Sequence, residues 1–193
     1  MIDMKLNGAV LMAQQLLQPR MANARMVVDC TAGNGKDTLF LARHASRQTS
    51  LWVFDIQEQA ISATKKLLTE HNVICDVHYI LDCHSNISSY IAFPVDIITF
   101  NLGYLPGGDH DVTTQADTTI KSVQACIELL ASGGLITIVS YPGHQAGNEE
   151  NNKVNDFLCS LPQQKYTVAC WQMINQIHNP PILYAIERKE KKA

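Results

Sequence analysis

Several features that would mark a specialised class of protein are missing from this 193-residue sequence. No apolar stretch approaches the ~20 residues that span a bilayer, so we expect no membrane-spanning helix. The first residues lack a basic segment followed by an apolar run, which predicts a cytoplasmic protein without a signal peptide. None of the six cysteines forms a C-x-x-C pair, and this spacing argues against structural zinc or another metal site.

A strong charge of one sign is also missing. The formal net charge is −3, and the only basic cluster is the tail over residues 188–192. A nucleic-acid partner would therefore have to meet basic residues that the fold gathers locally. The composition, 46% hydrophobic and 17% charged, is typical of globular proteins. With no internal repeat or low-complexity linker, residues 1–193 are expected to form a single domain.

What the sequence has instead is a regular alternation of short apolar runs and longer amphipathic segments. The runs predict strands at 26–30, 51–55, 77–81, 95–101, 135–140, 166–171 and 182–188. The segments between them predict helices near 36–45, 57–71, 84–91, 114–131 and 147–160, and residues 6–17 predict a helix before the first strand. This alternation is typical of an α/β protein whose parallel sheet has helices on both faces. Only about ten residues separate the last two strands, which predicts an antiparallel hairpin at the sheet edge.

The first predicted strand leads directly into a glycine-rich turn, Asp-Cys-Thr-Ala-Gly-Asn-Gly over residues 29–35, before the next helix. Gly33 and Gly35 permit a tight turn and the close approach of a ligand, and the helix start offers unpaired N–H groups. Asp29 is placed to meet the ammonium group of a bound amino-acid moiety. Asp55, at the end of the second strand, is placed to accept both hydroxyls of a ribose. The turn therefore predicts a cofactor site.

Two kinds of cofactor use this layout. A dinucleotide site needs a third glycine where this chain has Thr38, and it has no use for the Asp29 carboxylate beside a pyrophosphate. S-adenosylmethionine has no phosphate and carries an ammonium group, so the pattern favours this methyl donor. An NAD-binding protein and a nucleotide-binding module without catalytic activity are the alternatives. After the third strand, Asp82 can accept from the adenine amine and the Cys83 backbone can meet the ring, although Asp82 could also cap the helix that begins near His84.

The loop after the fourth strand, residues 101–110, should lie beside the methyl donor. It contains three glycines and a proline, which indicates a shaped loop. Asn101 occupies the place where amine methyltransferases with an Asn-Pro-Pro-Tyr motif position an acceptor for the target amine. Tyr104 could stack on a flat substrate, and Asp109 could take a proton or pair with a cation.

A second polar loop, residues 140–147, follows the fifth strand and should reach the same edge of the sheet. Tyr141 is a candidate stacking platform for an unstacked base, and His144 is a candidate for relaying a proton.

Together these segments resemble a known family. The motifs are Asp-x-Thr-x-Gly-Asn-Gly-x-Asp-Thr at 29–38, Phe-Asp-Ile-Gln at 54–57, Asn-Leu-Gly-Tyr-Leu-Pro-Gly-Gly-Asp at 101–109, Tyr-Pro-Gly-His at 141–144 and Asn-Pro-Pro at 179–181. They are similar to those of the bacterial "putative rRNA methylase" family, whose members include tRNA methyltransferases that complete 5-methylaminomethyl-2-thiouridine at the wobble position. The resemblance implies the class I (Rossmann-like) methyltransferase fold, with a seven-stranded, mostly parallel sheet.

The resemblance also implies a function. It points to S-adenosylmethionine as the cofactor, to the tRNA anticodon loop as the partner, and to methyl transfer onto the primary amine of 5-aminomethyl-2-thiouridine. An rRNA or a small-molecule amine is the alternative acceptor, and the oligomeric state stays open, with a homodimer as one alternative. The resemblance implies cofactor contacts at Asn34, Gly35, Asp55, Gln57, Cys83 and His84. Asp37, which belongs to the first motif, is a further candidate for cofactor binding.

Overall fold

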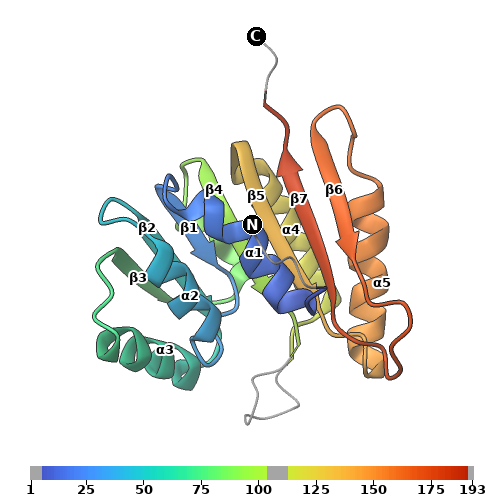
Figure 1. Ribbon diagram of the computed structural model, residues 1–193, viewed down its shortest axis with the longest axis horizontal. Helices are drawn as coiled ribbons and strands as arrows, with labels where there is room; N and C mark the ends of the chain where they lie inside the picture. The colour runs from blue at the N-terminus through green and yellow to red at the C-terminus, as the bar shows by residue number, and fades with distance from the viewer. Residues whose placement is uncertain (1–5, 104–112, 191–193) are drawn as a thin grey trace.

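The computed structural model describes residues 6–103 and 113–190, and these ranges form a seven-stranded sheet with helices on both faces (Figure 1). The strands are β1 (Met26–Asp29), β2 (Ser50–Asp55), β3 (Asp76–Leu81), β4 (Val95–Asn101), β5 (Leu130–Ser140), β6 (Tyr166–Trp171) and β7 (Ile182–Arg188). The helices are α1 (Ala9–Met21), α2 (Lys36–His44), α3 (Glu58–Glu70), the 3-10 helix η1 (His84–Ser89), α4 (Ala116–Leu129) and α5 (Gln145–Cys159).

The strand order is β3-β2-β1-β4-β5-β7-β6. Strands β1 to β5 pair in parallel, whereas β7 runs antiparallel to both of its neighbours, β5 and β6. The prediction of a mostly parallel α/β sheet with an antiparallel hairpin at the C-terminal end is confirmed. The hairpin folds back so that β7 lies inside the sheet and β6 forms its edge, where its central residues are exposed.

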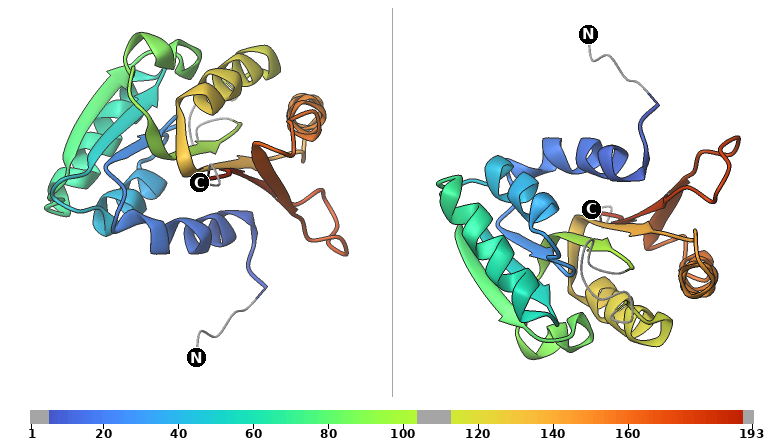
Figure 2. Two further views of the ribbon diagram at one scale, coloured as in Figure 1. Left: turned by 90° about the horizontal axis from the view of Figure 1, so that it is seen from above. Right: turned by 90° about the horizontal axis from the view of Figure 1, so that it is seen from below.

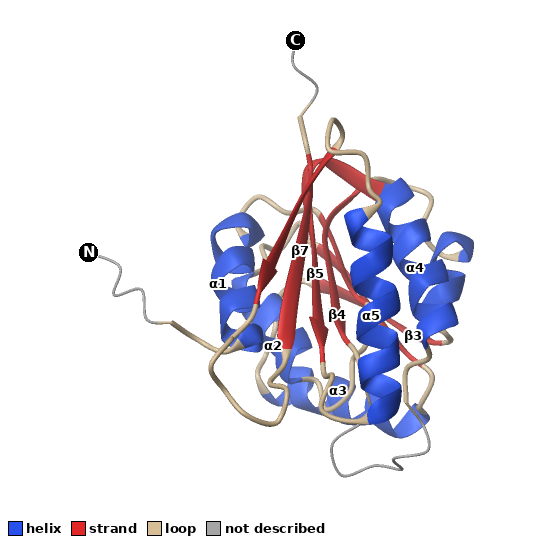
Figure 3. Cartoon of the chain, turned by 90° about the vertical axis from the view of Figure 1, so that its right-hand side faces the viewer, coloured by secondary structure: helices blue, strands red, loops and turns tan. Residues whose placement is uncertain are grey.

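Helices cover both faces of the sheet (Figures 2 and 3), and a hydrophobic layer holds them on each face. On one face, α1, α2 and α3 pack on the strands through residues such as Leu17, Leu41 and Leu68. On the other face, η1, α4 and α5 pack around the fully buried rings of Phe54 and Phe100. Because both faces are covered, the central strands are apolar at nearly every position, which is why they were visible as short apolar runs.

Most predicted boundaries are within two residues of the structure, and three elements differ by more than that or in helix type. Helix α1 begins at Ala9 and continues to Met21, with Pro19 inside its last turn. The segment after β3 is a 3-10 helix, not an α-helix, and it ends at Ser89. Strand β5 begins at Leu130, directly after α4, because a shift in its register with β4 accommodates the extra residues before the regular pairing at Leu135.

No helix in the described part of the chain combines the length and the apolar character that a membrane span requires.

The start of α2 depends on the backbone of Gly35, which has a φ of 77° and caps the helix in the left-handed region. A Cβ at this position would lie 2.8 Å from Thr64 Oγ1 and 2.9 Å from Thr64 Cα on α3. We therefore expect Gly35→Ala to lower the free energy of unfolding by about 2 kcal/mol or more, because the backbone strain and the clash add. Urea denaturation measures the loss.

The matched control for this substitution is Gly143→Ala. Gly143 lies outside the left-handed region, and its nearest neighbours are carbonyl oxygens at 3.7 and 3.8 Å from the added Cβ. It should change the stability by less than about 1 kcal/mol. Equal losses for the two variants would contradict the explanation.

Candidate active site

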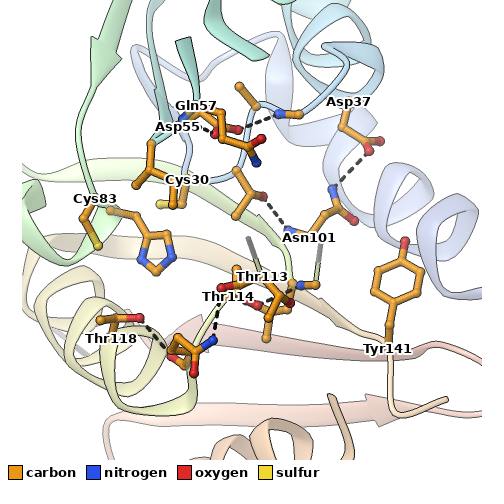
Figure 4. Close-up of a pocket in the computed structure, with 18 of the residues that line it drawn as sticks. Cys30, Asp37, Asp55, Gln57, Cys83, Asn101, Thr113, Thr114, Thr118 and Tyr141 are labelled. Atoms are coloured by element: carbon orange, nitrogen blue, oxygen red, sulfur yellow. Dashed lines mark hydrogen bonds between the residues drawn. The ribbon is translucent and has the colours of Figure 1, made fainter. Parts of the chain in front are cut away.

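A cavity of about 860 Å³ opens at the carboxyl edge of the parallel strands, where ligands bind in folds of this type (Figure 4). Its walls come from the ends of β1 to β5 and from the segments that follow each of them. The lining residues that the sequence predicted are Gly33, Asn34, Asp37, Asp55, Gln57, Asp82, Cys83, His84, Asn101, Tyr141 and His144. The predicted residues Tyr104 and Asp109 lie outside the described residues.

The glycine-rich turn is held by the carboxylate of Asp55. The N–H of Gly33 donates to Asp55 Oδ2 and the N–H of Gln57 donates to Asp55 Oδ1, both at 2.9 Å. One carboxylate therefore locks the turn after β1 to the turn after β2. Each carboxylate oxygen has a second acceptor site, so Asp55 can still accept hydroxyl groups from the cavity.

The carboxylate of Asp29 was predicted to face the cofactor, but in the structure it points away from the cavity. The residue is fully buried behind the turn and is not among the residues that line the cavity. Its oxygens accept from Thr38 Oγ1 at 2.6 Å and from the N–H of Thr31 at 3.1 Å. This corrects the prediction that the Asp29 carboxylate faces an ammonium group: the side chain points inward because Thr38, where a dinucleotide site has glycine, supplies its partner. Gly35 likewise lies behind the wall, against Thr64.

Burial also changes the acidity of Asp29. The loss of solvent raises the pKa of this carboxyl from its ordinary value of 3.8 to about 7, and the hydrogen bonds from Thr38 and Thr31 offset only part of the effect. The charges of Asp37 and Asp55 raise this pKa further. Asp29 is therefore a structural group at the back of the site that carries little charge at mildly acidic pH.

The helix η1 after β3 is capped by Cys83, whose Sγ accepts from the N–H of Ser85, so the alternative that Asp82 caps this helix is wrong. The contact of Asp82 with an adenine amine stays a prediction. This residue lines the cavity, and its carboxylate also accepts from the N–H of Cys83 at 2.7 Å and from the Tyr90 hydroxyl at 2.9 Å. The hydrogen bond from Tyr90 is the main reason that the pKa of Asp82 is lowered.

His84 is 93% buried and packs edge-to-face with Phe100, and burial lowers its pKa to about 4. Its ring is thus neutral at physiological pH, and within the described part of the chain no donor or acceptor reaches Nδ1.

The opposite wall of the cavity is built from the ends of β4 and β5. The N–H of Asn101 donates to Thr31 Oγ1 at 2.7 Å, and its side-chain Nδ2 donates to Asp37 Oδ2 at 3.0 Å. Figure 4 shows the Tyr141 hydroxyl pointing toward this pair. Burial raises the pKa of Tyr141, and the charge of Asp37 contributes to the rise. The phenol therefore stays protonated and is available as a donor.

A buried glutamate supports this wall from behind. Glu150 on α5 accepts from Thr114 Oγ1 at 2.8 Å and from Thr119 Oγ1 at 2.7 Å. Burial raises the pKa of Glu150, although the two hydroxyls counteract the rise. Thr114 in turn accepts from the N–H of Gly103 and donates its own N–H to the Gly103 carbonyl.

His144, the residue predicted to relay a proton, lines the cavity, and its Nδ1 accepts from the N–H of Gly147 at the start of α5.

Several lining residues were not predicted. They are Cys30, Thr31, Ala32, Lys36, Ile56, Leu102, Gly103, Thr113, Thr114, Gln115, Thr118, Gly143 and Asn179. Most of them lie inside or beside the motifs that were quoted, so proximity in the sequence could have suggested them. The threonine-rich wall at the start of α4 carried no such signal. Among the described residues, no three His, Cys, Asp or Glu side chains gather as a metal site.

Comparison with known proteins places this architecture among methyltransferases. The sequence model of the family described as "Putative rRNA methylase" matches residues 51–187. A curated relative from Arabidopsis thaliana, "tRNA (mnm(5)s(2)U34)-methyltransferase, chloroplastic", is 33% identical over 174 residues. This match covers 84% of the present chain but only 63% of the relative, so the chain spans less than two thirds of that protein.

Solved structures agree over nearly the full chain. The crystal structure of a "putative rRNA-methylase" from Clostridium thermocellum has 41% identity and a TM-score of 0.93, covering 96% of this chain and 100% of that one. A "putative methyltransferase" of Streptococcus mutans, solved in complex with SAH, has 35% identity and a TM-score of 0.86, with 95% and 99% coverage. The fold is therefore the Rossmann-like fold of methyltransferases that use S-adenosylmethionine.

The buried carboxyl of Asp29 makes stability depend on pH in a defined direction. Its pKa is higher in the folded protein, about 7, than its ordinary value of 3.8, so the folded state binds the extra proton between these values. The free energy of unfolding should therefore fall as the pH rises from about 4 to about 7, by about 4 kcal/mol at most from this group. In Asp29→Asn this contribution should vanish. Urea denaturation of both proteins across that pH range measures the difference, and parallel pH profiles would contradict the assignment.

Proposed function

Because the chain belongs to the family described as "putative rRNA methylase", we propose that it transfers a methyl group from S-adenosylmethionine to the primary amine of 5-aminomethyl-2-thiouridine at the tRNA wobble position. The observation that carries the proposal is the division of the cavity into two halves. One half, at the ends of β2 and β3, presents groups suited to a nucleoside. The other half presents an amide from the end of β4, a carboxylate from the start of α2 and a phenol that follows β5.

The residues of the first half fit S-adenosylmethionine. Asp55 faces the cavity with acceptor positions for ribose hydroxyls, and the exposed apolar side chain of Ile56 follows it in the wall, where it offers a surface for an adenine ring. Asp82 and Cys83 close the far end, with a carboxylate for the adenine amine and a neutral neighbour in His84. When bound, S-adenosylmethionine supplies an electrophilic methyl group on a sulfonium.

The residues of the second half fit an amine acceptor. Asn101 presents an amide whose nitrogen is already committed to Asp37, and this leaves its carbonyl oxygen to accept from a substrate N–H. Tyr141 offers an aromatic ring and a protonated hydroxyl beside it. Holding the amine in line with the methyl group contributes through orientation more than through a strong base. The chain supplies this alignment with groups that hydrogen bonds fix in place before the substrate arrives.

The identity of the acceptor is supported by the curated relative, whose printed name specifies wobble uridine of tRNA. The family description names rRNA instead. The net charge of −3 gives the protein no general attraction for either RNA. A specific, shape-dependent contact with an unstacked anticodon base suits such a surface better than binding to long stretches of backbone.

The decisive experiment incubates the protein with labelled methyl donor and tRNA that carries the 5-aminomethyl group, followed by mass spectrometry of the nucleosides. We expect 5-methylaminomethyl-2-thiouridine as the labelled product. Asn101→Ala should lower kcat by about 100-fold, because the amine loses its orienting acceptor, while Asp55→Ala should raise the KM for the methyl donor by about tenfold or more. Full activity in both variants would refute the assigned roles.

Parallel reactions with rRNA and with free alkylamines test the other acceptors. Methylation of rRNA alone would replace the proposed substrate and leave the methyl-transfer chemistry intact. A small-molecule acceptor would be indicated if tRNA binding were absent at every salt concentration, since an RNA complex should weaken as salt rises.

A further inference from the structure

The carboxylate of Asp37, in the first turn of α2, is held from two sides. Its Oδ1 accepts from Gln14 Nε2 of α1 at 2.9 Å, and its Oδ2 accepts from Asn101 Nδ2 at the end of β4 at 3.0 Å. The three residues come from three elements that are far apart in the sequence. Asp37 nevertheless lines the cavity, so the carboxylate is fixed in direction and still reaches the ligand space.

This arrangement determines how the Asn101 amide is turned. A carboxylate only accepts hydrogen bonds, so the amide must direct its NH₂ group toward Asp37. The carbonyl oxygen Oδ1 then faces away from Asp37, and although it is buried, no donor from residues 6–103 or 113–190 reaches it. A buried acceptor without a partner costs free energy unless another molecule supplies a donor. A ligand whose N–H group approached Asn101 would satisfy this acceptor.

Asp37 lies on the acceptor side of the cavity. In Figure 4 it forms one group with Asn101 and Tyr141, whereas Asp55, Gln57 and Cys83 form the opposite group. The charge of Asp37 acts on the carboxyl of Asp29 and on the phenol of Tyr141, and Lys36 and Asp55 line the same cavity. Asp29 is buried behind the turn and Asp55 faces the nucleoside half, so Asp37 is the anionic group placed to meet a cation beside Asn101.

We infer that Asp37 pairs with the nitrogen of the acceptor amine, and that Gln14 is the positioning residue that holds Asp37 in place. The inference rests on the proposed function and assigns Asp37 to the acceptor, where the sequence had assigned it to the methyl donor. As the new N–C bond forms and the S–C bond breaks with its electron pair left on sulfur, positive charge moves onto the nitrogen. A fixed carboxylate beside that nitrogen stabilises the charge where it develops.

The proton balance follows from the same geometry. The substrate alkylammonium loses one proton to solvent before reaction, which frees the lone pair, and the product leaves as a secondary ammonium ion. Asp37 takes no proton in this scheme and accepts a hydrogen bond from the nitrogen before and after transfer. Asn101 Oδ1 accepts a second one, and the two acceptors together direct the lone pair toward the methyl group.

The test uses binding, so that it does not depend on turnover. Two RNA hairpins with the sequence of one anticodon arm carry either 5-aminomethyl-2-thiouridine or 2-thiouridine at the wobble position, and the protein is saturated with S-adenosylhomocysteine. The wild-type chain should prefer the hairpin with the amine by about 10- to 100-fold, the range of a charge-assisted hydrogen bond. Asp37→Asn should abolish this preference and leave the affinity for the 2-thiouridine hairpin unchanged.

Two further variants complete the design. Asp156→Asn makes the same change of charge at an exposed position of α5 and should keep the full preference. Gln14→Leu, which retains the bulk of the side chain but removes the donor, should reduce the preference by a smaller factor of about three to ten. Calorimetry with S-adenosylhomocysteine should give wild-type affinity for all three variants, which also demonstrates that they are folded.

The outcomes separate the inference from the proposed function. No preference in the wild-type chain would refute the amine substrate, and the inference with it. A wild-type preference that persists in Asp37→Asn would overturn the inference alone. A tenfold or greater loss of S-adenosylhomocysteine affinity in Asp37→Asn would also overturn it, because the carboxylate would then serve the amino-acid end of the methyl donor.

Discussion

The parallel pairing of β1 to β5 is the constraint on which the rest of the site depends. Because these five strands run in the same direction, every turn that follows a strand end emerges at one edge of the sheet. Residues separated by more than one hundred positions, such as Thr31 and Tyr141, therefore line one cavity. The short hydrogen bonds from Gly33 and Gln57 to Asp55 then give this edge its shape. The antiparallel β7 lies outside this arrangement and completes the core.

The sign of the electrostatic potential in the cavity is determined by the carboxylates that line it. Asp37, Asp55 and Asp82 line the space, and Lys36 is the one Lys or Arg among the described lining residues. A cavity of this sign suits the cationic sulfonium donor and the amine acceptor that we propose, and it disfavours phosphate. The phosphates of the proposed RNA substrate would then have to be met outside the cavity, while only the base enters it. Asp29 does not add to the negative charge at mildly acidic pH, since its burial raises its pKa to about 7.

The fold could be predicted closely because parallel strands that are buried on both faces consist almost entirely of apolar residues, and such runs are recognisable in the sequence. All seven predicted strands exist, and four of the predictions for helices needed only small changes of boundary. The larger errors have local causes. The start of β5 was placed at Leu135 because a register shift with β4 has no apolar signature, and η1 adopts 3-10 geometry over a segment too short for its pattern to distinguish the two helix types. Contacts made by individual site residues with ligands remain predictions.

The sequence by itself determined the alternation of elements, the turn at 29–35 and the residue types available at each strand end. Those features depend on local patterns and spacing, which the chain displays directly. Only the tertiary structure decided which side chains face the cavity. Asp29 is turned inward because Thr38, in the first turn of α2, pairs with it, and Asp37 is held toward the end of β4 because Gln14 of α1 and Asn101 of β4 both donate to it. The orientation of Asp37 depends on partners 23 and 64 positions away, and that of Asp29 on how α2 packs behind β1, so no local pattern encodes either of them.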